Sequence, residues 1–206
     1  ISIDYPDNNQ PIANQLLNVQ ISATAPRGLN RVEYYIDGYL FSYAAAYPFN
    51  LNKSIDFLAN GLHNLTARAC DDVDNCSEQK LNFNVIKNNQ PKISEISLAL
   101  IQPAAAASLN KYDFPLALKA ETANPEQTAA IIFYFKDFNG KTRQIAQSQI
   151  INNTAEAQLT NILIPGLYKF YAEARGWYGQ TAQSQEVLIT VNNLPATATT
   201  APAIAQ

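Results

Sequence analysis

The sequence predicts an all-β chain folded as two tandem antiparallel β-sandwiches of about seven strands each. Three observations support this prediction. Apolar and polar residues alternate along short runs such as Val32 to Ile36, which is the period of a strand with one face on a core. Turn-forming residues separate these runs at roughly ten-residue spacing. The pattern of the first half then recurs about 105 residues later.

The repeat is clearest around one turn and the strand that follows it. Residues 61–76 read GLHNLTARACDDVDNC, and residues 166–181 read GLYKFYAEARGWYGQT. The first two residues and a pair of alanines align between them. The dipeptide Asp37-Gly38 recurs as Asn139-Gly140, and both favour a two-residue hairpin turn because these residues tolerate positive φ angles. Self-similarity at one period indicates two copies of one folding unit.

Seven runs in each copy are expected to form strands, because turn residues bound each of them. The expected strands are 1–5, 17–25, 31–37, 39–44, 49–57, 63–70 and 77–86 in the first copy, and 93–101, 114–122, 130–137, 142–148, 154–160, 167–175 and 182–191 in the second. The second core is expected to include Leu116, Leu118, Ile132, Tyr134, Phe170, Ala172, Val187 and Ile189. The alanine run at 104–107 is too short for a stable helix and is expected to be a loop or a single turn.

The repeat also predicts the domain boundaries. One sandwich is expected at 1–87 and the other at 93–191, joined by a short linker at 88–92 whose single proline restricts their relative motion. Residues 192–206 are rich in Ala, Thr and Pro without alternation, which predicts a flexible tail. Since the chain lacks methionine and begins at Ile1, we expect it to be a piece of a longer protein or a mature form.

The composition narrows the classes of partner. Hydrophobic residues make up 47% of the chain and charged residues only 15%, which is typical of a chain that forms cores rather than of a disordered one. The net charge is −3 and no basic patch stands out, so we expect no nucleic-acid partner. There is no apolar run of the roughly 18 residues that a spanning helix needs, so we expect no membrane insertion by this segment.

One stretch of the first copy resembles a known family. Residues 31–52 read RVEYYIDGYLFSYAAAYPFNLN and residues 57–75 read FLANGLHNLTARACDDVDN. This is similar to the pattern V-E-x-Y-x-D-G, then P-F/Y-x-F/L, then L-x-N-G-x-H-x-L-x-A-x-A and D-x-x-G-N of bacterial immunoglobulin-like (Ig-like) domains. The first copy departs from it at Asp74, where the family usually has Gly, and at its two cysteines. The second copy resembles a degenerate version.

The resemblance implies two tandem Ig-like sandwiches outside the cytoplasm, in the periplasm, at the cell surface or secreted. It implies a non-catalytic spacer or interaction region of a larger bacterial cell-envelope protein. Similar domains form C-terminal appendages of penicillin-binding transpeptidases, and a short pair with a Thr/Pro/Ala tail resembles those most. The alternatives are a segment of an adhesin that binds a protein partner, and a carbohydrate-binding accessory of a secreted glycosidase. The expected partners are therefore a protein or a cell-wall glycan, besides the rest of the parent chain.

Cys70 and Cys76 are the only cysteines, and they flank a predicted hairpin turn. If the last two strands of the first copy pair as predicted, the two side chains face each other and form a disulfide. A disulfide would favour an oxidising compartment. The alternatives are two free thiols or half of a metal site, although a zinc site would lack ligands because His63 is the single histidine.

The residues between these cysteines include Asp71, Asp72, Asp74 and Asn75. Oxygen ligands this close together are a candidate Ca²⁺ site. The alternative is an acidic turn in which the same side chains make turn hydrogen bonds and tolerate left-handed backbone angles. The segment lacks the spacing and the final Glu of an EF-hand loop, which favours the turn. No other cofactor is expected.

Aromatic residues form the second candidate binding surface. Trp177, the single tryptophan, and Tyr178 lie at the turn of the second copy that corresponds to the acidic turn of the first. They could stack on a sugar ring or a protein partner, or Trp177 could fold back onto its own sandwich. Tyr39, Phe41 and Tyr43 share one face of an expected strand, as a partner-facing patch or as part of the core.

Catalytic motifs are lacking in the sequence. A catalytic triad would have to use His63, which matches a family position where packing and a hydrogen bond explain it. There is no G-x-S-x-G, no H-E-x-x-H and no phosphate-binding glycine loop. We therefore expect this segment to be non-catalytic, whatever the activity of its parent.

Overall fold

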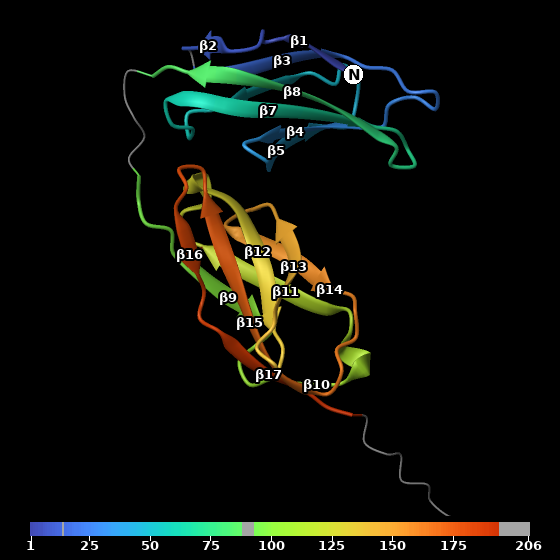
Figure 1. Ribbon diagram of the computed structural model, residues 1–206, viewed down its shortest axis with the longest axis vertical. Coiled ribbons are helices and arrows are strands. Elements are labelled where there is room, and N and C mark those ends of the chain that lie inside the picture. Colours follow the sequence, from blue (N-terminus) through green and yellow to red (C-terminus); the bar gives the residue numbers. More distant parts are fainter. Residues whose placement is uncertain (14, 88–92, 194–206) are drawn as a thin grey trace, which may run out of the picture.

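The computed structural model describes residues 1–13, 15–87 and 93–193 (Figure 1). Strands β1 to β8 form one pair of sheets, which we call the first module, and strands β9 to β17 form another, the second module. Each module places a three-stranded sheet against a larger one, which is the two-sheet arrangement of an Ig-like sandwich. The all-β fold predicted from the sequence is confirmed.

The first module has two sheets. Its three-stranded sheet has the order β1-β3-β6, with β1 at Ser2–Tyr5, β3 at Leu16–Ser22 and β6 at Leu51–Ser54. Its five-stranded sheet has the order β2-β8-β7-β4-β5, with β2 at Gln10–Ile12, β8 at Cys76–Val85, β7 at Gly61–Cys70, β4 at Arg31–Ile36 and β5 at Tyr39–Ala44. All pairings are antiparallel except that of β2 with β8.

The second module repeats this topology. Its smaller sheet has the order β14-β11-β9, with β14 at Thr154–Leu159, β11 at Leu116–Thr122 and β9 at Leu98–Gln102. Its larger sheet has the order β10-β17-β15-β12-β13, with β10 at Ser108–Leu109, β17 at Val187–Val191, β15 at Gly166–Gly176, β12 at Thr128–Lys136 and β13 at Thr142–Ser148. Strand β16 (Thr181–Gln183) also pairs with β15, and short 3₁₀ helices lie at Lys111–Asp113 (η1) and Pro125–Gln127 (η2).

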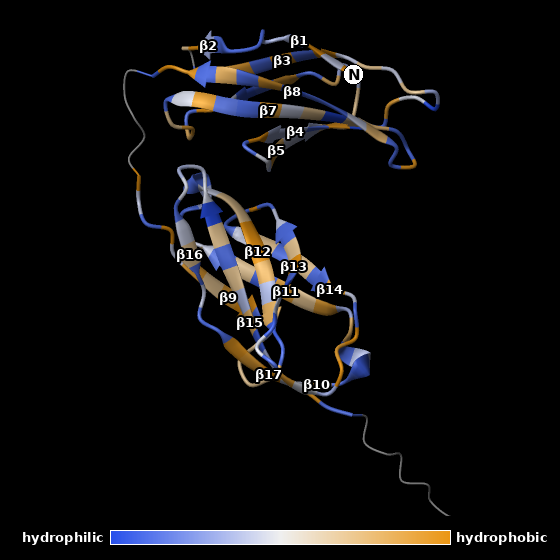
Figure 2. Cartoon of the chain, viewed as in Figure 1, coloured by the Kyte–Doolittle hydropathy of each residue, from blue (hydrophilic) through white to orange (hydrophobic). Residues whose placement is uncertain are grey.

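Each module has its own hydrophobic core, and hydrophobic and hydrophilic residues alternate along several of the strands around it (Figure 2). In the first module Tyr34 is fully buried, and its hydroxyl donates to the Phe49 carbonyl. Burial raises the pKa of Tyr34. Ala67 and Ala69 of β7 are small enough to leave room for such large side chains between the sheets.

One strand of the second module faces the core with the side opposite to the predicted one. Ile131, Phe133 and Phe135 of β12 pack in the core, whereas the sequence pattern had suggested Ile132 and Tyr134. Tyr134 instead lies on the outer face, where its ring stacks on Tyr171 at 5.2 Å between centroids. The prediction was wrong because β12 is apolar on both faces, so alternation alone cannot select one.

Other differences concern short elements. Strands β2 and β10 were not predicted, since each has only two or three residues. The strand expected at 182–191 divides into β16 and β17 around Ser184, whose amide donates to the Ala172 carbonyl and whose hydroxyl accepts from the Ala172 amide. The turn around Asn139-Gly140 is longer than two residues, because Lys136 pairs with Thr142.

The predicted linker at 88–92 lies outside the described residues, as does the tail from residue 194 onwards. Of the predicted tail, Asn192 is held in place: its amide donates to the Leu109 carbonyl over 2.8 Å and its side chain donates to Ser108 over 2.6 Å. In the described part of the chain, no helix is long and apolar enough to cross a membrane.

Candidate functional site

The turn between β7 and β8 is closed by a disulfide. Cys70 and Cys76 are register partners across the hairpin, and their sulfurs are bonded at 2.07 Å. The disulfide predicted from the two cysteines is confirmed. It fixes both ends of the acidic turn in one module only, because the second module has Arg175 and Thr181 as partners at the corresponding place.

The acidic side chains of this turn are engaged by donors from the protein itself. Asp71 accepts hydrogen bonds from the Val73 amide (3.0 Å) and from the Asn75 amide and side chain (both 2.9 Å). The Asn75 side chain contributes most to holding the pKa of Asp71 below its usual value. Asp72 receives both a 2.8 Å and a 2.9 Å hydrogen bond from Arg27.

The remaining carboxylate, that of Asp74, pairs with Arg31 at 2.7 Å. Its backbone has φ = 62°, which suits the Gly that the family pattern carries there, and the corresponding Gly179 has φ = 78°. Over the described ranges, no group of three or more His, Cys, Asp or Glu side chains is placed to hold a metal ion. Calcium binding at this turn stays a prediction, and an ion would have to displace the arginines.

The corresponding turn of the second module contacts the first module. The Trp177 ring lies 4.8 Å from that of Phe57 and 5.8 Å from that of Tyr39, and it packs against the core of the first module. The Tyr178 hydroxyl donates to the Phe57 carbonyl. These aromatic side chains therefore meet at the junction between the modules and not on a free surface.

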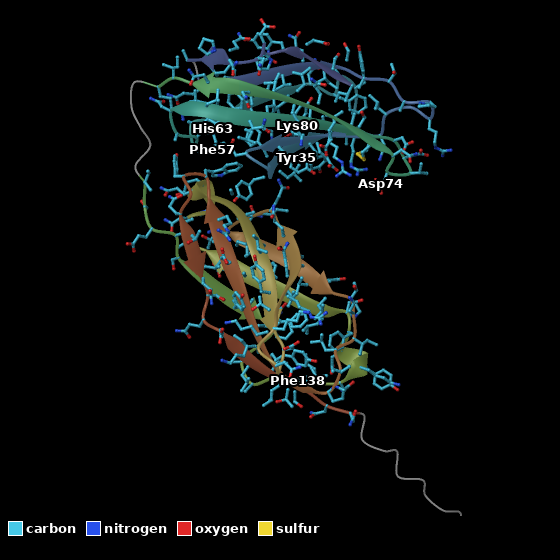
Figure 3. The ribbon with its side chains drawn as sticks, viewed as in Figure 1. Tyr35, Phe57, His63, Asp74, Lys80 and Phe138 are labelled. Carbon is cyan, nitrogen blue, oxygen red and sulfur yellow. A yellow bond between two sulfur atoms is a disulfide. The ribbon has the colours of Figure 1, made fainter. Side chains whose placement is uncertain are left out.

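The surface that receives Trp177 combines β5 with the loop between β6 and β7, which we call the receiving end. Tyr39 and Phe41 come from β5, and Phe57 from the loop, with Phe41 and Phe57 5.5 Å apart. Tyr43 is 65% exposed and does not join the cluster. The sequence analysis missed Phe57, whose only signal was an apolar residue ahead of the Gly61 turn. Figure 3 shows Phe57 and His63 at the side of the first module that faces the second.

Lys87 holds the receiving end from the inside. It is buried, and its Nζ donates to the carbonyl oxygens of Ile55 (2.9 Å), Asp56 (2.7 Å) and Leu58 (2.7 Å). Burial lowers the pKa of this ammonium group. The Asn60 side chain bonds both the amide and the carbonyl of Lys87. The loop is thereby fastened to the end of β8.

His63 fastens the same loop to the β4–β5 turn. Its Nδ1 lies 2.7 Å from an Asp37 carboxylate oxygen and its Nε2 lies 3.0 Å from the Ala59 carbonyl. Both partners are acceptors, so both bonds form only when the ring carries two protons. Burial acts to lower the pKa of His63, but the bonds to Asp37 and Ala59 outweigh it and raise that pKa. The packing expected of His63 is present too, on Phe83 at 5.7 Å.

A groove of about 890 Å³ separates the modules beside this contact. The Gln149 side chain crosses it and donates to the Leu40 carbonyl. Its wall on the second module includes the ion pair of Lys119 with Glu156 at 2.8 Å. Tyr35 of the first module lines the opposite wall. Polar and apolar side chains both line this groove, and the hydrogen bond from Gln149 to Leu40 joins the two modules across it.

Comparison with known proteins finds one family match, which lies within the first module. Residues 1–67, about a third of the chain, match the family described as bacterial Ig domain. A search of curated proteins found no significant match.

Solved structures that match the chain include the fibronectin(III)-like modules of CbhA from Clostridium thermocellum. They share 17% identity and a TM-score of 0.40, over 93% of this chain and 94% of that one. A tetra-tandem repeat from the extending region of a large adhesion protein shares 15% identity and a TM-score of 0.38, over 92% and 48%. SGBP-B of Bacteroides ovatus, solved with a mixed-linkage heptasaccharide, matches with 15% identity and a TM-score of 0.32. The match covers 92% of this chain and 47% of that one. The chain thus spans about half the length of the last two.

Proposed function

We propose that this chain is a non-catalytic, extracytoplasmic pair of Ig-like modules that holds its neighbours in a larger bacterial cell-envelope protein at a restricted separation and angle. The packing of Trp177 on the core of the first module is the observation that carries this proposal. Two sandwiches with separate cores could otherwise move independently, because relative motion is the default for small interfaces. The Cys70–Cys76 disulfide supports a location outside the cytoplasm.

The parent that we propose is a penicillin-binding transpeptidase, on the resemblance of a short Ig-like pair followed by an Ala/Thr/Pro-rich segment to the appendages of those enzymes. The reading frame around this segment tests the parent directly. A transpeptidase domain in the same frame would support it. A frame made of further Ig-like repeats would replace it with the adhesin alternative, and a glycosidase domain with the carbohydrate-binding alternative.

The carbohydrate-binding alternative has less support, because the rings of Trp177 and Tyr178 that would stack on a sugar are engaged at the junction. Sedimentation with purified peptidoglycan and affinity electrophoresis in soluble glycans test it. Retardation that persists in the Trp177→Ala variant would point to a glycan site elsewhere on the chain. Binding of both the unmodified chain and the Trp177→Ala variant to immobilised protein partners would favour the adhesin alternative.

Small-angle X-ray scattering of the Trp177→Ala variant tests the spacer role. The aromatic contacts at stake contribute on the order of 0.5–1.5 kcal/mol each, so we expect their loss to broaden the distribution of inter-module distances and to increase the radius of gyration. Tyr112→Ala is the matched control, because Tyr112 is an exposed aromatic residue of η1 outside the junction. Identical scattering from both variants and the unmodified chain would contradict the proposal.

A further inference from the structure

The second module has a counterpart of the receiving end. The β14–β15 loop and the start of β15 read ILIPGLY at 162–168, where the first module reads FLANGLH at 57–63. The Tyr168 hydroxyl donates to the Ile164 carbonyl over 2.9 Å, as His63 bonds the carbonyl of Ala59, also four residues earlier. The two loops therefore share this one hydrogen bond, and Ile162 stands where the first module has Phe57.

This second receiving end has exposed apolar side chains. Phe138, Ile162 and Ile164 are 54%, 60% and 62% exposed, although all three are large hydrophobic residues. A groove of about 560 Å³ lies between the β12–β13 turn and the β14–β15 loop, and its floor includes Phe135 and Tyr168. The Phe138 ring approaches that of Tyr168 edge-on at 6.3 Å. Figure 3 shows Phe138 at the end of the second module that lies away from the first.

The path of the chain relates this surface to the junction already described. In the first module Gly61 pairs with Val85, so the chain leaves β8 beside the receiving end. In the second module Gly166 pairs with Val191, so the chain leaves β17 beside the exposed surface in the same way. At the first receiving end, the module that comes next in the chain supplies the side chains that cover it. A module that followed β17 would reach the second receiving end by the same route.

We propose that Phe138, Ile162 and Ile164 form a docking surface for the aromatic turn of another Ig-like sandwich. The partner that fits is a β-turn presenting a Trp or Tyr side chain, as Trp177 and Tyr178 do at the first receiving end. A second copy of this chain could offer only its acidic turn, because its aromatic turn is already engaged. The acidic turn, Asp71 to Asn75, fits poorly because it has no aromatic residue. This inference rests on the spacer role in the proposed function and not on the transpeptidase parent, since a further Ig-like module after β17 would belong to the adhesin alternative.

The test is a three-module chain, in which residues 1–193 are followed by a further copy of residues 88–193. We expect the δ1 methyl resonances of Ile162 and Ile164 in the middle module to shift relative to the 206-residue chain. The shifts should be lost when Trp177→Ala is made in the added copy alone. The Ile164 shift should also be lost in the middle-module variant Ile162→Asp. The control is Ile101→Asp, at another exposed isoleucine of that module, which should keep both shifts.

Three results would overturn the inference. The methyl resonances could be unchanged by the added module while Trp177 of the middle module still contacts the first, and the proposed function would then stand alone. If the added module leaves the methyl resonances unchanged and Trp177 of the middle module also makes no contact with the first module, the proposed function fails as well. Concentration-dependent shifts of Ile162 and Ile164 in the 206-residue chain itself would make a second copy the occupant instead.

Discussion

The two modules share one strand order, but different side-chain contacts stabilise their corresponding ends. In the first, a buried Lys87 and an Asp37–His63 pair hold the receiving end, and a disulfide closes the opposite turn. In the second, Tyr168 and Phe138 occupy the corresponding end, and the opposite turn carries Trp177. Alternating apolar residues and small alanines are common to both cores. The frame thus depends on the cores, and the ends can change without altering it.

Removing a central core side chain should have the largest effect and should separate the two modules. Phe170 is almost completely buried in the second core. We expect Phe170→Ala to destabilise that module by about 3–5 kcal/mol, from lost burial and the cavity left behind. Urea denaturation, followed by resolved NMR signals of each module, should show the second module unfolding at lower urea than in the unmodified chain. The transition of the first module should be unchanged. A parallel shift of both would mean that the modules unfold as one cooperative unit.

The buried ammonium group offers the next test. Lys87→Met keeps much of the side-chain volume but leaves three loop carbonyls without their donor. An unsatisfied buried polar group costs about 1–3 kcal/mol, so we expect a loss of that order in the first module alone. Lys80→Met is the control, because Lys80 is exposed on β8. Equal stability of the two variants would show that Lys87 contributes no more than a surface lysine.

Loss of the disulfide should destabilise the first module by an amount within the same range. The chain-entropy model gives about 2 kcal/mol for so short a loop. We expect the Cys70→Ser, Cys76→Ser double variant to lose this amount in the first module, with the second unchanged. Mass spectrometry supplies a prior check, because the oxidised chain should be two hydrogens lighter than the reduced one. Equal masses would remove the argument for an oxidising compartment.

The smallest effect should be a pH dependence confined to the first module. The folded-state pKa of His63 is raised, so the stabilisation from its charged form is complete below the unfolded value of about 6.5. That stabilisation should be lost as the pH rises through the folded-state pKa. Asp37 and Lys87 are the other charged groups that act on this ring. Melting curves should show this loss of stability in the first module. The stability of the second module, which has Tyr168 at the corresponding position, should not change over the same pH range.

His63→Tyr sharpens the same comparison, since it gives the first module the side chain that the second has at Tyr168. We expect the variant to fold and to lose the pH dependence between neutral and mildly alkaline conditions. A dependence that survived the substitution would assign it to another titrating group.

The sequence predicted what local patterns determine and missed what distant contacts determine. Asp37-Gly38 gives the expected turn, with φ of 51° and 84°. The same signal at Asn139-Gly140 failed, because the residues on either side extend the turn. The role of Lys87 could not be read from the sequence, since its three acceptors lie about thirty residues earlier and are backbone atoms without a residue signature.

The candidate binding residues illustrate the same limit. Trp177 and Phe57 were two separate apolar residues in the sequence, and only the fold brings them within 4.8 Å. The disulfide was predictable, in contrast, because both cysteines belong to one hairpin whose register the alternation already fixes.

The parallel pairing of β2 with β8 bears on how the chain responds to mechanical tension. A pull on the two ends of a module slides these strands along each other, so their hydrogen bonds must break together rather than in sequence. The first module has three residue pairs in this ladder and the second has two between β10 and β17. Forced unfolding is governed by the height of the barrier, so in single-molecule pulling we expect the second module to rupture at the lower force. The opposite order would show that other contacts resist the pull.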